Sequence, residues 1–168
     1  TVSSTVLMYK TNDLKAIINK VNIDSALTYV RQLSGETNVV IDGQTQKIAS
    51  RFHSNQGNTL AEKYIQQKFK DFNVPFFVQD YGNNAKNIIG YKKGTKYPGW
   101  KFIICAHFDS YSSNQSDAPG ADDNASGVAT VLEAARILSE YNTEYTIEFA
   151  LWDEEEIGLK GSAYYAQN

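Results

Sequence analysis

The spacing of apolar positions predicts helices in four parts of this chain. In residues 23–33 apolar side chains recur at helical spacing, with Asp24 or Ser25 as the capping residue. Residues 59–72 repeat this pattern, with Asn58 as the expected N-cap. A last helix is expected to begin near residues 159–162. The clearest stripe lies in residues 126–141 and consists of Val128, Val131, Leu132, Ala135 and Leu138.

Between the second and third helices the pattern changes to that of strands. Short runs of β-branched and aromatic residues at 74–79, 87–91 and 100–106 are bounded by Gly, Asn, Lys and Pro. After the third helix, residues 145–152 alternate between apolar and other side chains. The segments 100–106, 126–141 and 145–152 therefore predict a βαβ unit with parallel strands and a right-handed crossover.

Acidic and histidine side chains follow both strands of this predicted unit. His107 and Asp109 come directly after the first strand, and residues 153–156 come directly after the second. Asp122 and Asp123 lie in the loop before the crossover helix. Parallel strands end at the same edge of a sheet, where open α/β sheets bind ligands. The sequence thus predicts that these three groups meet at one edge.

Each group also has an ordinary structural explanation. A histidine at a strand end often bonds a nearby carboxylate, and acids before a helix often serve as turn or N-cap residues. Adjacent glutamates are common in solvated turns. A metal site explains all three groups together. Asp109 could orient the imidazole of His107. One of Glu155 and Glu156 could bind the metal, and the other could act as a general base.

Composition and charge narrow the class of protein. The 168 residues are 42% hydrophobic, which is typical of a globular domain that buries a core. A single cysteine, Cys105, excludes an internal disulfide and a cysteine zinc cage, and its apolar strand predicts a buried core position. His53 fits no metal-ligand spacing and is interpreted as a surface or packing residue.

The charge is unevenly divided along the chain. Residues 104–168 contain two basic and twelve acidic residues, a balance that disfavours a nucleic acid partner and suits a cation. The sequence contains no apolar run near the length of a membrane span and no signal-peptide pattern, so no membrane partner is expected.

Three motifs in the last third resemble the M28 family of zinc aminopeptidases, of the bacterial leucyl type. They are Ala-His-Phe-Asp-Ser at 106–110, Pro-Gly-Ala-Asp-Asp-Asn-Ala-Ser-Gly at 119–127 and Glu-Glu-Ile-Gly-Leu-Lys-Gly-Ser at 155–162. Residues 51–65 and 86–90 also look like family segments. The resemblance covers about residues 45–166, and residues 1–44 match only loosely.

The resemblance implies a site for two zinc ions. His107 corresponds to a ligand of one zinc, Asp122 to the carboxylate that bridges both, and Glu156 to a ligand of the other. Glu155 corresponds to the general base that takes a proton from water. The implied reaction is hydrolysis of the N-terminal peptide bond in peptides with a free N-terminus.

The resemblance also assigns two supporting residues and the fold. Asp109 corresponds to the residue that orients the histidine, and Asp123 to the partner of Asp122 in a cis peptide bond. The implied fold is a three-layer α/β/α domain with a mixed, mostly parallel sheet. We expect a helical lead-in over residues 1–44 and the core of the metallopeptidase fold over residues 45–168.

The family pattern contains two further ligands, an aspartate and a histidine, which no residue after Glu156 supplies. We therefore expect a truncated domain whose C-terminal half is missing, which binds zinc partially and is inactive or impaired alone. A missing C-terminal segment or an oligomer is expected to cover the open sheet face. By family analogy the protein is expected to be bacterial and secreted or periplasmic.

Two alternatives stay open at this point. One is a single-zinc enzyme of the glutaminyl cyclase type, which shares the fold but not this form of the middle motif. The other is a peptidase-like binding domain without catalysis. The intact motifs around Asp122 and Glu155 favour the two-zinc peptidase over both.

Overall fold

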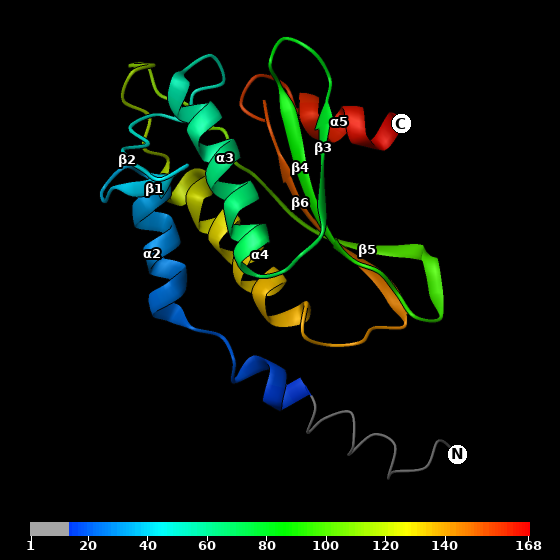
Figure 1. Cartoon of the computed structure of the whole chain (residues 1–168). Coiled ribbons are helices and arrows are strands. Elements are labelled where there is room, and N and C mark those ends of the chain that lie inside the picture. The colour runs from blue at the N-terminus through cyan, green and yellow to red at the C-terminus, as the bar shows by residue number, and fades with distance from the viewer. Residues whose placement is uncertain (1–13) are drawn as a thin grey trace.

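The structure, a computed structural model, describes residues 14–168 and contains one mixed sheet with helices on both faces (Figure 1). The strand order is β3-β4-β6-β5, with β3 and β4 antiparallel, β4 and β6 antiparallel, and β5 and β6 parallel. The expected mixed α/β sheet is confirmed, although only one of its three strand pairs is parallel in the described residues. The strands are β3 (Phe76–Asp80), β4 (Lys86–Lys92), β5 (Tyr97–His107) and β6 (Tyr145–Trp152).

The helices form a layer on each side of this sheet. On one side, α3 (Gln56–Asp71) and α4 (Ser126–Leu138) pack against the sheet, and α2 (Ile23–Leu33) packs against α4 (Figure 1). This side holds the larger core, which includes Ile88 and Phe149. On the other side, Tyr165 of α5 (Lys160–Gln167) packs against a smaller core of Ile89, Ala150 and Trp152. None of the helices described is long and apolar enough to cross a bilayer.

The helix starts differ from the predicted caps. Helix α2 has the predicted bounds, but its N-cap is Asn22, whose side chain accepts the Ser25 N–H at 3.0 Å. Helix α3 begins earlier than predicted, with Asn55 as N-cap. The early start requires Gly57, because a Cβ there would lie 2.0 Å from the Ser50 carbonyl oxygen. Any side chain at this position, even that of alanine, would therefore displace the first turn of α3.

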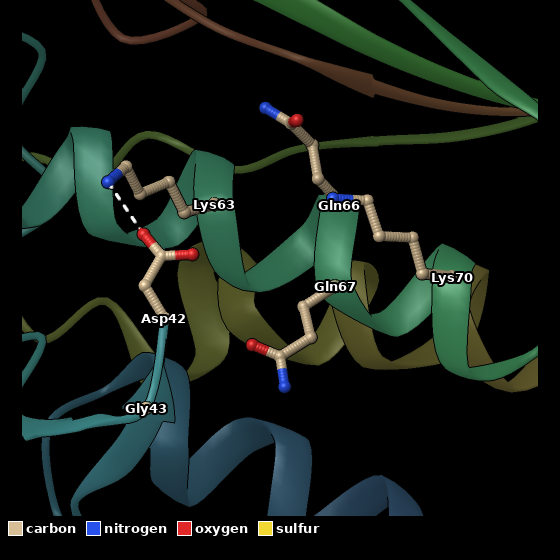
Figure 2. A pocket seen from close by; sticks show the side chains of 6 residues that line it. All are labelled: Asp42, Gly43, Lys63, Gln66, Gln67 and Lys70. Carbon is tan, nitrogen blue, oxygen red and sulfur yellow. Dashed lines mark hydrogen bonds and ion pairs between the residues drawn. The ribbon is translucent and has the colours of Figure 1, made fainter.

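A hairpin precedes α3 in the segment expected to be a helical lead-in. Strands β1 (Val39–Ile41) and β2 (Gln44–Gln46) pair antiparallel around Asp42 and Gly43, which have φ of 52° and 76°. Two successive positive φ values are typical of the Asp-Gly hairpin turn. Figure 2 shows Asp42 bonded to Lys63 of α3 at 2.9 Å, beside a pocket of about 420 Å³. This exposed ion pair connects the turn of the hairpin to the helix.

Strand β5 lies at the edge of the sheet and is largely exposed. Trp100 and Phe102 are 73% and 62% exposed, and Ile103 is 43% exposed. Cys105 is exposed as well, so the prediction that it lies in the core is wrong. The reason is that α5 covers β4 and β6, while no described element covers β5 on the side of Cys105.

Candidate metal centre

The ends of the parallel strands β5 and β6 bring a histidine and two glutamates together. His107, the last residue of β5, pairs in register with Trp152, the last residue of β6. The chain then turns, and ligand atoms of His107, Glu155 and Glu156 lie within 4.8 Å of one another. The predicted meeting of these side chains at one sheet edge is confirmed.

Asp109 connects the histidine to the glutamate loop. Its carboxylate is 1% exposed, and Oδ1 lies 3.3 Å from Nδ1 of His107, as the predicted orienting role requires. The sequence did not reveal a second set of contacts: Oδ1 accepts the N–H of Glu155 and Oδ2 accepts the N–H of Glu156, both at 3.1 Å. Asp109 therefore fixes the backbone of both glutamates relative to the imidazole.

The loop before α4 turns Asp123, and not Asp122, toward the histidine. Oδ1 of Asp123 lies 3.0 Å from Nε2 of His107, although the aspartate side chain is 76% exposed. Asp122 is exposed, and its carbonyl oxygen accepts the Ser126 hydroxyl at 2.7 Å. The cis peptide bond joins Asp123 to Asn124, so the prediction of a cis bond between Asp122 and Asp123 is wrong.

The local backbone explains this correction. Residues 121–125 form a single wide helical turn in which Asp123 and Asn124 leave helical geometry. Neighbouring carboxylates therefore point in different directions, and only one can face the strand end. The sequence does not show which of two adjacent aspartates faces the strand end. In the structure the carboxylate near His107 is that of Asp123 and not that of Asp122.

The third glutamate of the run faces elsewhere. Glu154 lies 3.6 Å from Nδ1 of His53 and 3.5 Å from Nζ of Lys160. His53 also packs on Phe52, with ring centroids 4.6 Å apart, as expected of a packing histidine. These contacts separate Glu154 from the candidate metal ligands.

A buried polar network supports the base of the glutamate loop. The Asp153 carboxylate accepts a hydrogen bond from the Asn58 side-chain amide at 2.8 Å. The backbone N–H of Asp153 donates to the side-chain oxygen of Asn87 at 3.2 Å. The Asn87 side chain also donates to the Gly161 carbonyl at 2.8 Å. The network joins α3, β4 and α5 beneath the loop. Neither asparagine has a motif spacing that would identify it from sequence, and Asn58 has this role instead of capping α3.

The electrostatics of the site favour a bound cation. Burial lowers the pKa of His107, but the hydrogen bond that its imidazole donates to Asp109 and the charges of Asp109, Glu155 and Asp123 raise it, and the net shift of the pKa is upward. Burial raises the pKa of Glu156, and the charge of Asp123 adds to the shift. Several carboxylates thus surround one imidazole, which is an arrangement that a divalent cation stabilises. Imidazole nitrogen and carboxylate oxygen are also ligands that zinc takes in catalytic sites.

Comparison with known proteins agrees with this chemistry. Residues 87–168 match Peptidase family M28. A probable zinc metalloprotease of Pyrenophora tritici-repentis (strain Pt-1C-BFP) is 31% identical over 92% of the chain, which covers 39% of that protein. Aminopeptidase YwaD of Bacillus subtilis (strain 168) is 35% identical over 64% of the chain, or 22% of that protein.

Solved structures share the fold. LapB from Legionella pneumophila, at 23% identity, gives a TM-score of 0.75 over 92% of this chain and 41% of that one. A Bacteroides thetaiotaomicron glutaminyl cyclase bound to N-acetylhistamine, also at 23% identity, gives 0.67 over 88% of this chain and 57% of that one. The chain spans about two fifths of the length of the first curated relatives. The family match identifies residues 87–168 of this chain as part of a member of peptidase family M28.

Proposed function

We propose that this chain is part of a zinc-dependent peptidase that removes residues from the N-terminus of peptides. The observation that carries the proposal is the cluster of His107, Glu155 and Glu156, whose ligand atoms lie within 4.8 Å of one another at the sheet edge. The relatives named zinc metalloprotease and aminopeptidase support zinc as the metal and an N-terminal cleavage site. Substrates are peptides with a free N-terminus.

The proposed zinc ligands are His107, Asp123 and Glu156. Asp123 would have the ligand role that the family resemblance assigned to Asp122, because Asp123 is the aspartate beside His107. When bound, a zinc pair supplies Lewis-acid polarisation of the scissile carbonyl and acidifies water. Glu155 takes the proton from the attacking water and returns it to the leaving amine. Asp109 holds the imidazole and the backbone of the two glutamates.

The chain alone is proposed to hydrolyse peptides weakly or not at all. With Asp123 shared, His107 and Asp123 give one zinc two protein ligands, and Asp123 and Glu156 give the other two. Catalytic zinc ordinarily has about three protein ligands. Zinc binding and hydrolysis therefore have to be measured separately.

Calorimetric titration with zinc tests the ligand assignment. Glu155→Gln should bind zinc like the wild type, whereas Asp123→Asn should weaken binding about 10- to 100-fold or more, because it removes a proposed ligand. Asp122→Asn is the matched control, because it makes the same change at the adjacent aspartate, which has no ion pair with His107. This variant should bind zinc normally. Equal effects of the two asparagine substitutions would refute the assignment of Asp123.

Peptide hydrolysis is then measured on the full-length protein that contains this chain. Release of the first residue from a free peptide, but not from its N-acetylated form, should require zinc and be lost in Glu155→Gln. Activity that survives this substitution would contradict the general-base role. Cyclisation of peptides that begin with glutamine, with one zinc per chain, would support the glutaminyl cyclase alternative instead.

The prediction that a further segment or a second copy covers the open sheet face concerns β5. Within residues 14–168 no strand pairs with the outer edge of β5, and Trp100 and Phe102 on this strand are exposed. Both observations support the proposal, because exposed apolar edge strands tend to pair with another strand. Light scattering should reveal a dimer if a second copy is the partner. A soluble monomer at all concentrations would contradict self-association.

A further inference from the structure

Arg51 is a fully buried cation that bonds only main-chain oxygens with its guanidinium. The side chain is 0% exposed and is the largest of the fully buried side chains. Its Nε donates to the Phe108 carbonyl at 2.7 Å, and one terminal nitrogen donates to the Leu33 and Pro119 carbonyls at 2.5 and 2.6 Å. The other terminal nitrogen donates to the Gly120 carbonyl at 2.9 Å.

These carbonyls belong to segments that carry the proposed ligands. Phe108 follows His107 directly, and Pro119 and Gly120 begin the loop that leads to Asp123. The guanidinium is a planar group whose five donors have fixed directions, so it sets the distance between the strand end and the loop. A side chain with one donor atom cannot reproduce this geometry.

The loop also approaches the arginine too closely for any side chain at Gly120. A Cβ at this position would lie 2.9 Å from the Arg51 terminal nitrogen and 2.3 Å from the Asp123 carbonyl oxygen. Gly120 has φ of 45°, which also favours glycine. The backbone of the Asp123 loop is therefore fitted to the guanidinium.

The main chain of Arg51 extends these connections to the glutamate loop. Its carbonyl accepts the Ser110 N–H and the Asn58 side-chain amide, both at 3.2 Å. The same Asn58 amide donates to Asp153, two residues before Glu155. Arg51 thus contacts, directly or through one residue, all three segments that form the candidate metal centre.

The charge of Arg51 is also directed to this centre. Among residues 14–168 the guanidinium forms hydrogen bonds only with main-chain carbonyls, so carbonyl dipoles solvate it at short range. Burial lowers the pKa of Arg51 to about 10, and the charges of Asp109, Asp123 and Glu156 oppose this shift. The carboxylates that stabilise this cation are those of the candidate metal centre.

We propose that Arg51 is a positioning residue for the zinc site, which sets the separation of His107 and Asp123 by bonding the backbone beside each. The inference rests on the proposed function for its zinc readout. It assigns no contact between Arg51 and substrate or metal. Its effect is exerted through the backbone of residues 108 and 119–120.

The test compares Arg51→Lys with Arg136→Lys. Arg136 is the control, because its guanidinium also bonds a main-chain carbonyl, that of Lys20. It bonds the Glu133 carboxylate as well, and it lies in α4 away from the site. In calorimetric titration with zinc alone, Arg51→Lys should raise the Kd about 10- to 100-fold, as the loss of groups that orient metal ligands does. Arg136→Lys should leave the Kd unchanged.

Hydrogen exchange provides a readout that does not depend on metal. Arg51→Lys should accelerate exchange selectively in residues 108–125, while α3 and β4 keep wild-type rates. Unchanged zinc affinity, or acceleration spread evenly over the chain, would overturn the positioning role and leave only a stabilising one. If the wild type binds no zinc, the proposed function fails. Hydrogen exchange still decides the inference, because acceleration confined to residues 108–125 supports it and uniform acceleration overturns it.

A second variant covers the case in which Arg51→Lys does not fold. Gly120→Ala disturbs the same contact from the loop side, because its methyl group would collide with the guanidinium. It should weaken zinc binding and accelerate exchange in residues 119–125. Normal zinc affinity and normal exchange in Gly120→Ala would overturn the inference.

Discussion

Replacing Asp109 by alanine should destabilise the protein strongly, because its carboxylate is buried and has three partners. It accepts the N–H groups of Glu155 and Glu156 at 3.1 Å and faces His107 at 3.3 Å. A hydrogen bond to a charged group contributes about 1.5 to 3 kcal/mol. Because both glutamates are half-buried, the lower value applies to their two amides, which gives a loss of about 3 kcal/mol.

Asp109→Asn should lose about half as much, because one amide oxygen can still accept one of the two N–H groups. Urea denaturation followed by tryptophan fluorescence measures both variants, since Trp152 lies at the end of β6 beside this loop. With a slope of about 2 kcal/mol/M, a loss of about 3 kcal/mol lowers the midpoint by about 1.5 M. The matched control is Asp117→Ala in an exposed loop position, which should stay within about 0.5 kcal/mol of the wild type.

The order of the three variants decides whether the reasoning holds. Alanine should be worst, asparagine intermediate and the Asp117 control close to wild type. If Asp109→Ala denatures at the same urea concentration as Asp117→Ala, the carboxylate does not hold the glutamate loop. The orienting role assigned to Asp109 would then be refuted as well.

Three further predictions concern other parts of the chain. Gly57→Ala should cost about 1 to 3 kcal/mol in urea denaturation, because its Cβ would lie 2.0 Å from the Ser50 carbonyl oxygen; a neutral result would contradict this close approach. Burial raises the pKa of Asp153 to about 7, so its folded-state pKa lies above the unfolded value and stability should fall as the pH rises from about 4 to 7. In urea denaturation at pH 5 and pH 8, Asp153→Asn should reduce the difference in stability between the two pH values. An unchanged difference would contradict the raised pKa of Asp153. Cys105 should react fully with a thiol reagent in the folded protein, and protection until unfolding would contradict its exposure.

The fold could be predicted where one face of an element is continuously buried. The bounds of α2 and β6 follow from their apolar periodicity, and both match the prediction. The start of α3 was less certain, because Asn55 and Asn58 are both capable caps, and the structure has Asn55 as the N-cap. The burial of Cys105 was mispredicted because strand sequence does not show which strand lies at the sheet edge.

The candidate site was predictable at the level of segments and less so at the level of atoms. Parallel pairing of β5 and β6 brings His107 close to Glu155 and Glu156, as the order of elements requires. The choice between Asp122 and Asp123 depends on the backbone of one irregular turn, which the residue types do not determine. The buried contacts of Arg51 and Asn58 were not predicted, because they join distant segments and follow no spacing.

The bonding pattern of Arg51 has a consequence for how related sequences can vary. Every residue provides a carbonyl oxygen, whatever its side chain, so the acceptors at Leu33, Phe108 and Pro119 survive substitution of those residues. Homologues can therefore change these three positions without compensation at the arginine. Analyses that detect contacts from correlated substitutions should find no signal linking Arg51 to them, even though it connects the segments around the metal centre.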